Sequence, residues 1–129
     1  MGSRIRLGLG LAIACCLVLA AVAFGQGAVP ECNPFSPTSD GTAGDDICLG
    51  TDGADRFSLG AGNDRLVAGP GNDVITAVRG RDRVDAGPGN DQIQARDDTR
   101  DVVHCGPGFD RFFGDPGDRT RGCEKDVRF

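Results

Sequence analysis

The sequence predicts an all-β solenoid, a fold in which short strands repeat along one axis. An apolar residue stands two positions after nearly every member of a series of regularly spaced aspartates, and a glycine stands two positions before most of them. The aspartates recur every nine residues, with one inserted residue before the last two, at Asp46, Asp55, Asp64, Asp73, Asp82, Asp91, Asp101 and Asp110. A period this strict is typical of solenoids.

The composition agrees with a thin and repetitive core. The chain has 129 residues, 21 of them glycine, and contains no tryptophan or tyrosine. A chain of this length forms one small domain, and few large side chains remain to build an ordinary globular interior. The core is therefore expected to repeat with the same period as the aspartates.

Residues 1–23 have the features of a secretory signal peptide. Arg4 and Arg6 precede an apolar run from Leu7 to Phe24, which contains the small residues Ala21-Val22-Ala23. We expect cleavage after Ala23 and export of the remainder. A membrane anchor is one alternative, because a run of this length just spans a bilayer. A lipoprotein at Cys15, after Ala12-Ile13-Ala14, is another.

The charge of the exported chain argues against a nucleic-acid partner. Cleavage would remove two arginines and no acidic residue, so the formal charge would change from −5 to −7. Binding to nucleic acid relies on a basic surface. After cleavage we expect no stable membrane insertion.

Each repeat unit combines tight turns with a carboxylate. Glycines in the second and fourth positions allow positive φ angles and leave backbone carbonyls uncovered, and the aspartate in the sixth position adds charged oxygens. Calcium takes about six to eight oxygen ligands in flexible geometry, whereas magnesium demands stricter geometry. The unit therefore favours Ca²⁺ as its ligand.

The last three positions of each unit are expected to form a short strand whose middle residue points inward. These middle residues are Cys48, Phe57, Leu66, Ile75, Val84, Ile93, Val103 and Phe112. They form the predicted core.

Residues 41–113 resemble the RTX, or hemolysin-type, calcium-binding nonapeptide repeat G-G-x-G-x-D-x-U-x, where U is a large apolar residue. The units include GTDGADRFS, LGAGNDRLV, AGPGNDVIT and AGPGNDQIQ. Repeats of this pattern form a calcium-binding β-helix. The resemblance implies a parallel β-roll in which two units make one coil, so that alternate turns stack on the same edge and share ions.

By this resemblance the turns divide into two edges. The glycine-rich edge comprises turns 50–55, 68–73, 86–91 and 105–110, and we expect it to hold up to three ions. Its expected ligand residues are Asp55, Asp73, Asp91 and Asp110, with Gly53, Gly69, Gly71, Gly87, Gly89 and Gly108 in the turns.

The variant edge comprises turns 41–46, 59–64, 77–82 and 95–101, the last with one inserted residue. We expect its first pair of turns to bind through Asp46 and Asp64. Later turns depart from the pattern at Val78, Arg79, Arg96 and Asp98, and the next turn ends in Arg119 where an aspartate is expected, so no further sites are expected there.

Four cysteines would remain after cleavage, and an even number in an exported chain indicates two disulfides. Zinc is disfavoured because no Cys-x-x-Cys pair occurs. In the β-roll, Cys123 follows Cys105 by two units, or one coil, so these two should stack and form a bond. Cys32 and Cys48 would then close the N-terminal end. Residues 24–40 and 114–129 are thus expected to cap the two ends of the repeats.

The predicted function is that of a secreted calcium-binding protein in which Ca²⁺ drives folding. No enzyme is expected, since the single histidine, His104, lacks the partners of a catalytic triad. Two alternatives remain open. Outward arginines (Arg56, Arg65, Arg83 and Arg111) could bind an acidic polymer or the cell surface, and the chain could be a stand-alone repeat tail of an exported enzyme system.

Overall fold

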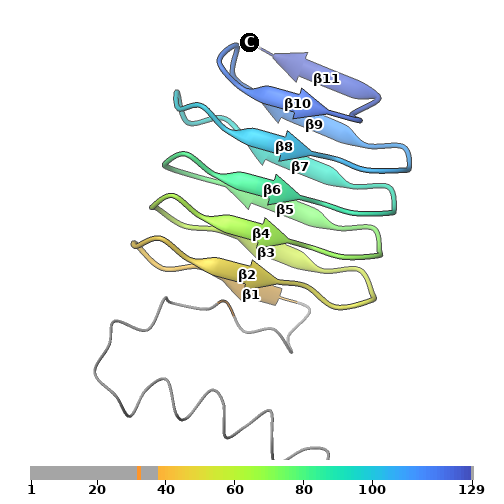
Figure 1. The fold of residues 1–129 in the computed structure, drawn as a ribbon, viewed down its shortest axis with the longest axis horizontal. Helices are drawn as coiled ribbons and strands as arrows, with labels where there is room; N and C mark the ends of the chain where they lie inside the picture. The colour runs from red at the N-terminus through yellow and green to blue at the C-terminus, as the bar shows by residue number, and fades with distance from the viewer. Residues whose placement is uncertain (1–31, 33–37, 129) are drawn as a thin grey trace, which may run out of the picture.

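A computed structural model describes residue 32 and residues 38–128, which form a stack of flattened coils (Figure 1). The predicted signal peptide, residues 1–23, and most of the N-terminal cap lie outside the described residues. Within residue 32 and residues 38–128 no helix is long and apolar enough to cross a membrane.

The strands alternate between two facing sheets. The six-stranded sheet has the order β1 (Thr38–Asp40), β3 (Arg56–Ser58), β5 (Val74–Ala77), β7 (Gln92–Ala95), β9 (Arg111–Gly114) and β11 (Lys125–Arg128). The five-stranded sheet has the order β2 (Ile47–Leu49), β4 (Arg65–Val67), β6 (Arg83–Asp85), β8 (Val102–His104) and β10 (Arg119–Arg121). Neighbouring strands pair in parallel throughout both sheets.

The register follows a coil of two repeat units. Phe57 pairs with Ile75 and Ile75 with Ile93 in one sheet, while Leu66 pairs with Val84 in the other. Equivalent residues of successive coils therefore stack directly above one another. The predicted parallel β-roll is confirmed, and it makes about five turns.

The predicted inward row forms the core. Each of its eight residues is at most 1% exposed. A second buried row, which the sequence did not predict, lies where each strand leads into the next turn, and its members are Leu59, Ala68, Ala77, Ala86, Ala95 and Cys105. Four of these six residues are alanines, so this row adds little volume to the core.

Disulfides join the ends of the roll as predicted. Cys32 is bonded to Cys48 with a Cα–Cα distance of 4.7 Å, and Cys105 is bonded to Cys123 with a Cα–Cα distance of 5.2 Å. Both distances lie in the usual range of about 4.4 to 6.8 Å. The second pair is not in direct register, because Arg121 pairs with His104 and Gly122 is thus opposite Cys105.

This shift arises from a shortened last coil. Arg119 pairs with Val102, so this coil falls one residue short of two full units, and Asp118 rather than Arg119 lies opposite Asp101. The expectation that an arginine occupies the aspartate position here is therefore wrong. Lys125 pairs with Arg111 across a shorter connection still, which places Glu124 opposite Asp110. Both edges therefore end in an acidic residue.

Candidate metal centre

The repeated aspartates form one hydrogen-bonded ladder on each edge of the roll. The backbone N–H of each aspartate donates to Oδ1 of the aspartate in the next coil. On the glycine-rich edge the bonds run from Asp55 to Asp73, Asp91 and Asp110, each at 2.8 Å. On the variant edge they run from Asp46 to Asp64, Asp82, Asp101 and Asp118, at 2.8–3.0 Å. The N–H of Asp110 donates to Glu124 at 2.8 Å.

The ladder places carboxylates deep between the turns. Every aspartate of the ladder is at most 4% exposed. In six of them the second oxygen, Oδ2, is buried and has no hydrogen-bond partner in the described part of the chain: Asp64, Asp73, Asp82, Asp91, Asp101 and Asp110. A buried polar atom without a partner is costly and rare in native proteins. Six of them in two columns make these carboxylates the candidate ligands of a cation.

The first aspartate of each ladder differs because a threonine in the same turn donates hydrogen bonds to its carboxylate. Oδ2 of Asp55 accepts the backbone N–H of Thr51 at 2.7 Å, and Thr51 Oγ1 donates to the same carboxylate at 3.0 and 3.1 Å. Thr42 makes the same contacts with Asp46. At the other end of the variant edge, Oδ2 of Asp118 accepts the N–H of Asp115 at 2.7 Å. The unpartnered oxygens are thus confined to the inner coils.

The same six carboxylates have raised pKa values. Burial raises the pKa of Asp82 to about 7 and those of Asp91 and Asp101 to about 6, from 3.8. Burial also raises the pKa of Asp64, Asp73 and Asp110. Neighbouring acidic groups add repulsion, and the N–H bond to each Oδ1 only partly opposes both effects. Without a cation, charging these groups therefore destabilises the fold.

Glycines in the turns allow the coils to approach each other closely. Gly89 has φ of 151°, and a Cβ atom there would overlap the carbonyl oxygen of Gly71 in the coil before it. A Cβ on Gly108 would overlap the carbonyl oxygen of Gly89 in the same way. These carbonyl oxygens therefore face the next turn of the glycine-rich edge.

The variant edge replaces part of this backbone packing with side chains. Oδ2 of Asp115 accepts the N–H groups of Asp97 and Asp98, each at 2.8 Å, and Oδ2 of Asp97 accepts the N–H of Gly80 at 3.0 Å. Asp98 adopts a φ of 65°, which is uncommon for a residue other than glycine but tolerated by aspartate. The irregular turn 95–101 is thus held in register by carboxylates.

The donor set suits a hard divalent cation. Carboxylate oxygens and turn carbonyl oxygens occur on the same edge of the roll. Both are oxygen ligands of the kind that calcium prefers. In the described part of the chain, no group of three or more His, Cys, Asp and Glu side chains is placed to hold a metal ion alone. A bound ion would therefore need the turn carbonyls as well as the aspartates.

The sequence-predicted residues fall into this arrangement as two sets. Asp55, Asp73, Asp91 and Asp110 stack on the glycine-rich edge together with the predicted glycines, and Asp46 and Asp64 begin the variant edge. Their role as metal ligands stays a prediction.

The expected ligand set left out later members of the ladder. Asp82 and Asp101 keep the same burial and the same unpartnered oxygen despite their altered turns. Asp118 and Glu124 were missed because the nine-residue count fails in the short last coil. A recurring acidic-basic dipeptide signals both positions, since Asp118-Arg119 and Glu124-Lys125 repeat the pattern of Asp110-Arg111.

Comparison with known proteins agrees with this geometry. Residues 40–75 and 67–98 match the family model of the RTX calcium-binding nonapeptide repeat (4 copies). No curated protein matches the chain, and no solved structure matches it.

Proposed function

Since the chain carries RTX calcium-binding nonapeptide repeats across residues 40–98, we propose that it is a secreted, non-catalytic protein whose β-roll folds when its turns bind Ca²⁺. The observation that carries this proposal is the double column of buried carboxylate oxygens without partners. A cation would supply the missing partner and offset the repulsion between successive aspartates. Binding to the folded state alone would then contribute directly to folding.

Three residues define the site that we expect to bind most strongly. Asp73, Asp91 and Asp110 lie on the glycine-rich edge, each has an unpartnered Oδ2, and their turns keep both glycines. We expect ions between successive turns of this edge. Calcium would supply positive charge and a flexible coordination sphere there, while the aspartates and turn carbonyls would provide the oxygens.

Secretion and the absence of catalysis belong to the same proposal. The apolar N-terminal sequence and the two disulfides fit export to an oxidising compartment. Outside the cell calcium is abundant, and we expect folding to occur there. His104, the single histidine of the chain, lies exposed at the end of β8, 3.6 Å from Asp85, in a contact between surface side chains.

A calcium titration of the oxidised chain from residue 24 onward tests the proposal. We expect far-UV circular dichroism to change from a coil spectrum to a β spectrum as calcium is added, and equal concentrations of magnesium to have little effect. Asp73→Ala and Asp91→Ala should each weaken the calcium response. Full native circular dichroism in excess chelator, unchanged by calcium, would contradict the proposal.

A further inference from the structure

The outward arginines do not form one row, because consecutive repeats alternate between the two sheets. Arg65 and Arg83 are register partners on the neighbouring strands β4 and β6. Arg56 and Arg111 lie on β3 and β9 of the opposite sheet, where Val74 and Gln92 occupy the equivalent positions between them. Of these four arginines, only the pair on the five-stranded sheet adjoin each other.

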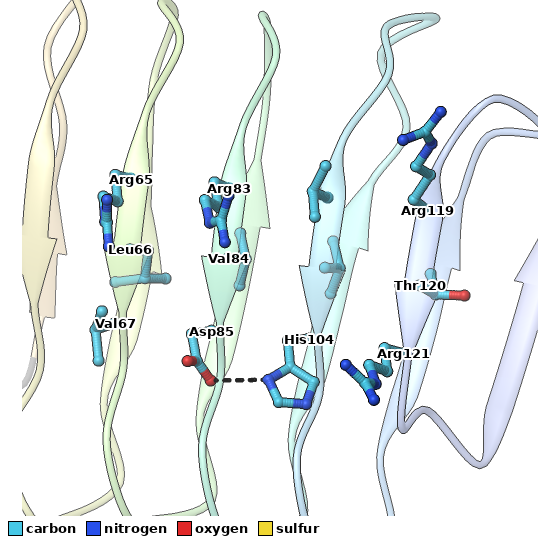
Figure 2. A pocket seen from close by; sticks show the side chains of 12 residues that line it. Arg65, Leu66, Val67, Arg83, Val84, Asp85, His104, Arg119, Thr120 and Arg121 are labelled. Carbon is cyan, nitrogen blue, oxygen red and sulfur yellow. Dashed lines mark ion pairs between the residues drawn. The ribbon is translucent and has the colours of Figure 1, made fainter.

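The last coil adds to this cluster. Its strand β10 contributes Arg119 and Arg121, both exposed, to the outer surface of the five-stranded sheet. We call the surface made by Arg65, Arg83, Arg119 and Arg121 the cationic face (Figure 2). None of these four side chains makes an ion pair or a side-chain hydrogen bond within the described part of the chain.

The charge of the cationic face is opposite to that of the whole molecule. Asp85 is the single acidic side chain on the outer surface of strands β2, β4, β6, β8 and β10, while the chain as a whole has a formal charge of −5. Asp85 is turned toward His104, with 3.6 Å between Oδ1 and Nδ1 (Figure 2). An acidic protein that gathers free arginines on one face has a local site for an anion.

The cationic face forms a shallow groove that crosses four strands. The groove runs from β4 to β10, and Val67 and Val102 contribute exposed apolar surface between the charged side chains. Neighbouring strands lie about 4.8 Å apart, so the arginines of β4 and β6 are one strand spacing apart. Those of β6 and β10 are two spacings, or about 10 Å, apart. This layout suits an extended chain with regularly spaced charges.

From this layout we propose that the cationic face binds an extended acidic polysaccharide, laid across strands β4 to β10. Arginine guanidinium groups pair with sulfate or carboxylate groups through paired hydrogen bonds. Asp85 and His104 add hydrogen-bonding groups suited to sugar hydroxyls, and the valines offer apolar contacts. Single-stranded nucleic acid fits less well, because its bases stack on aromatic side chains and the groove has no Phe, Tyr or Trp among its lining residues.

The test compares polymers with one backbone and different charged groups. Binding of the oxidised chain to dextran sulfate, carboxymethyl dextran and neutral dextran is measured at a fixed excess of free calcium. We expect binding to at least one charged dextran, weaker binding as salt is raised, and none to neutral dextran. The two charged polymers separate a preference for sulfate from one for carboxylate.

A matched pair of double variants localises the binding. Arg83→Gln with Arg119→Gln removes two charges from the cationic face, and Arg56→Gln with Arg111→Gln removes two from the same repeat position of the other sheet. We expect about a tenfold loss of affinity in the first double variant and less than about a twofold loss in the second. All four residues are exposed, so circular dichroism in calcium should be unchanged in both.

Three results would overturn the proposal: equal losses in the two double variants, no binding to either charged dextran, or tighter binding to single-stranded DNA or to anionic phospholipid vesicles. The outcome is separate from that of the calcium titration. A chain that ignores calcium but binds through the cationic face would contradict the proposed function and leave this inference standing.

Discussion

Replacing Asp91 with asparagine should strengthen the metal-free protein and weaken its response to calcium. Asp91 lies within the glycine-rich edge, is 2% exposed, and has an unpartnered Oδ2. Asparagine keeps an oxygen that can accept the backbone N–H of Asp73, which now donates to Oδ1 at 2.8 Å. It removes the buried charge and one of the proposed calcium ligands.

The size of the effect follows from the raised pKa. Burial raises the pKa of Asp91 from 3.8 to about 6, and each unit corresponds to about 1.4 kcal/mol, so the charged form costs at most about 3 kcal/mol above pH 6. Screening by nearby solvent lowers this cost, and the new amide N–H₂ group also lacks a partner, so part of the gain is lost. We expect the free energy of unfolding of Asp91→Asn in chelator at pH 7.5 to rise by about 1 to 2 kcal/mol.

Urea unfolding followed by circular dichroism, in chelator and in saturating calcium, measures both effects. Asp55→Asn is the control, because Asp55 lies on the same edge but its Oδ2 accepts the N–H of Thr51 at 2.7 Å. Thr51 Oγ1 donates to both carboxylate oxygens, so asparagine, with a single acceptor oxygen, loses at least one of these contacts and relieves no unpartnered oxygen. Stability in chelator should therefore fall by about 1 kcal/mol. If Asp91→Asn lost as much stability in chelator as Asp55→Asn, the unpartnered oxygen would have no energetic consequence and our reasoning would fail.

Three further predictions concern the metal-free state, the turns and the C-terminal disulfide. In chelator, the free energy of unfolding should be greatest below pH 3.8 and should decline as pH rises through about 6 to 7. The reason is that the folded-state pKa values of Asp82, Asp91 and Asp101 lie above the unfolded value. A melting temperature that rises with pH would contradict this prediction. Gly89→Ala should lower the free energy of unfolding by more than about 2 kcal/mol even in calcium, because Gly89 has a positive φ and the new Cβ would overlap the carbonyl oxygen of Gly71. Gly44→Ala, at the same repeat position in the first turn, should lower it by less than about 1 kcal/mol. Equal losses in urea unfolding would refute the account of coil packing. Replacing Cys105 and Cys123 together by serine should lower stability by about 2 to 4 kcal/mol in urea unfolding, and an unchanged midpoint would show that the last coil contributes little to the cooperative unit.

The repeat pattern predicted most of the fold because the coil has a fixed length. A nine-residue period with one inward residue leaves little choice of which side chains are buried, and Phe57, Ile75 and Ile93 are stacked as the spacing required. The same spacing predicted that Cys105 and Cys123 lie close enough for a disulfide, although the two residues are not in direct register. Local spacing sufficed for these features because each residue contacts mainly its equivalents one coil away.

Only the tertiary structure decided which acidic groups occupy the ends of the ladders. Asp118 and Glu124 reach their places because backbone pairing of the last strands tolerates coils shorter than two full units, which no fixed period predicts. The repeat pattern also did not predict which aspartate oxygens lack a hydrogen-bond partner. That depends on contacts within the turn, such as the hydrogen bond from Thr51 to Asp55.

The sequence alone determined that aspartates, glycines and apolar residues would stack in columns, because a strict period in a solenoid translates directly into position. The structure decided which columns share a face. The chain changes sheet at every turn, so Arg65 and Arg83 lie on one sheet while Arg56 and Arg111 lie on the other. Arg119 joins the first pair because the shortened last coil sets the register of β10. Which charged side chains share a face of this protein therefore depends on the geometry of its coils, which the nine-residue period alone does not give.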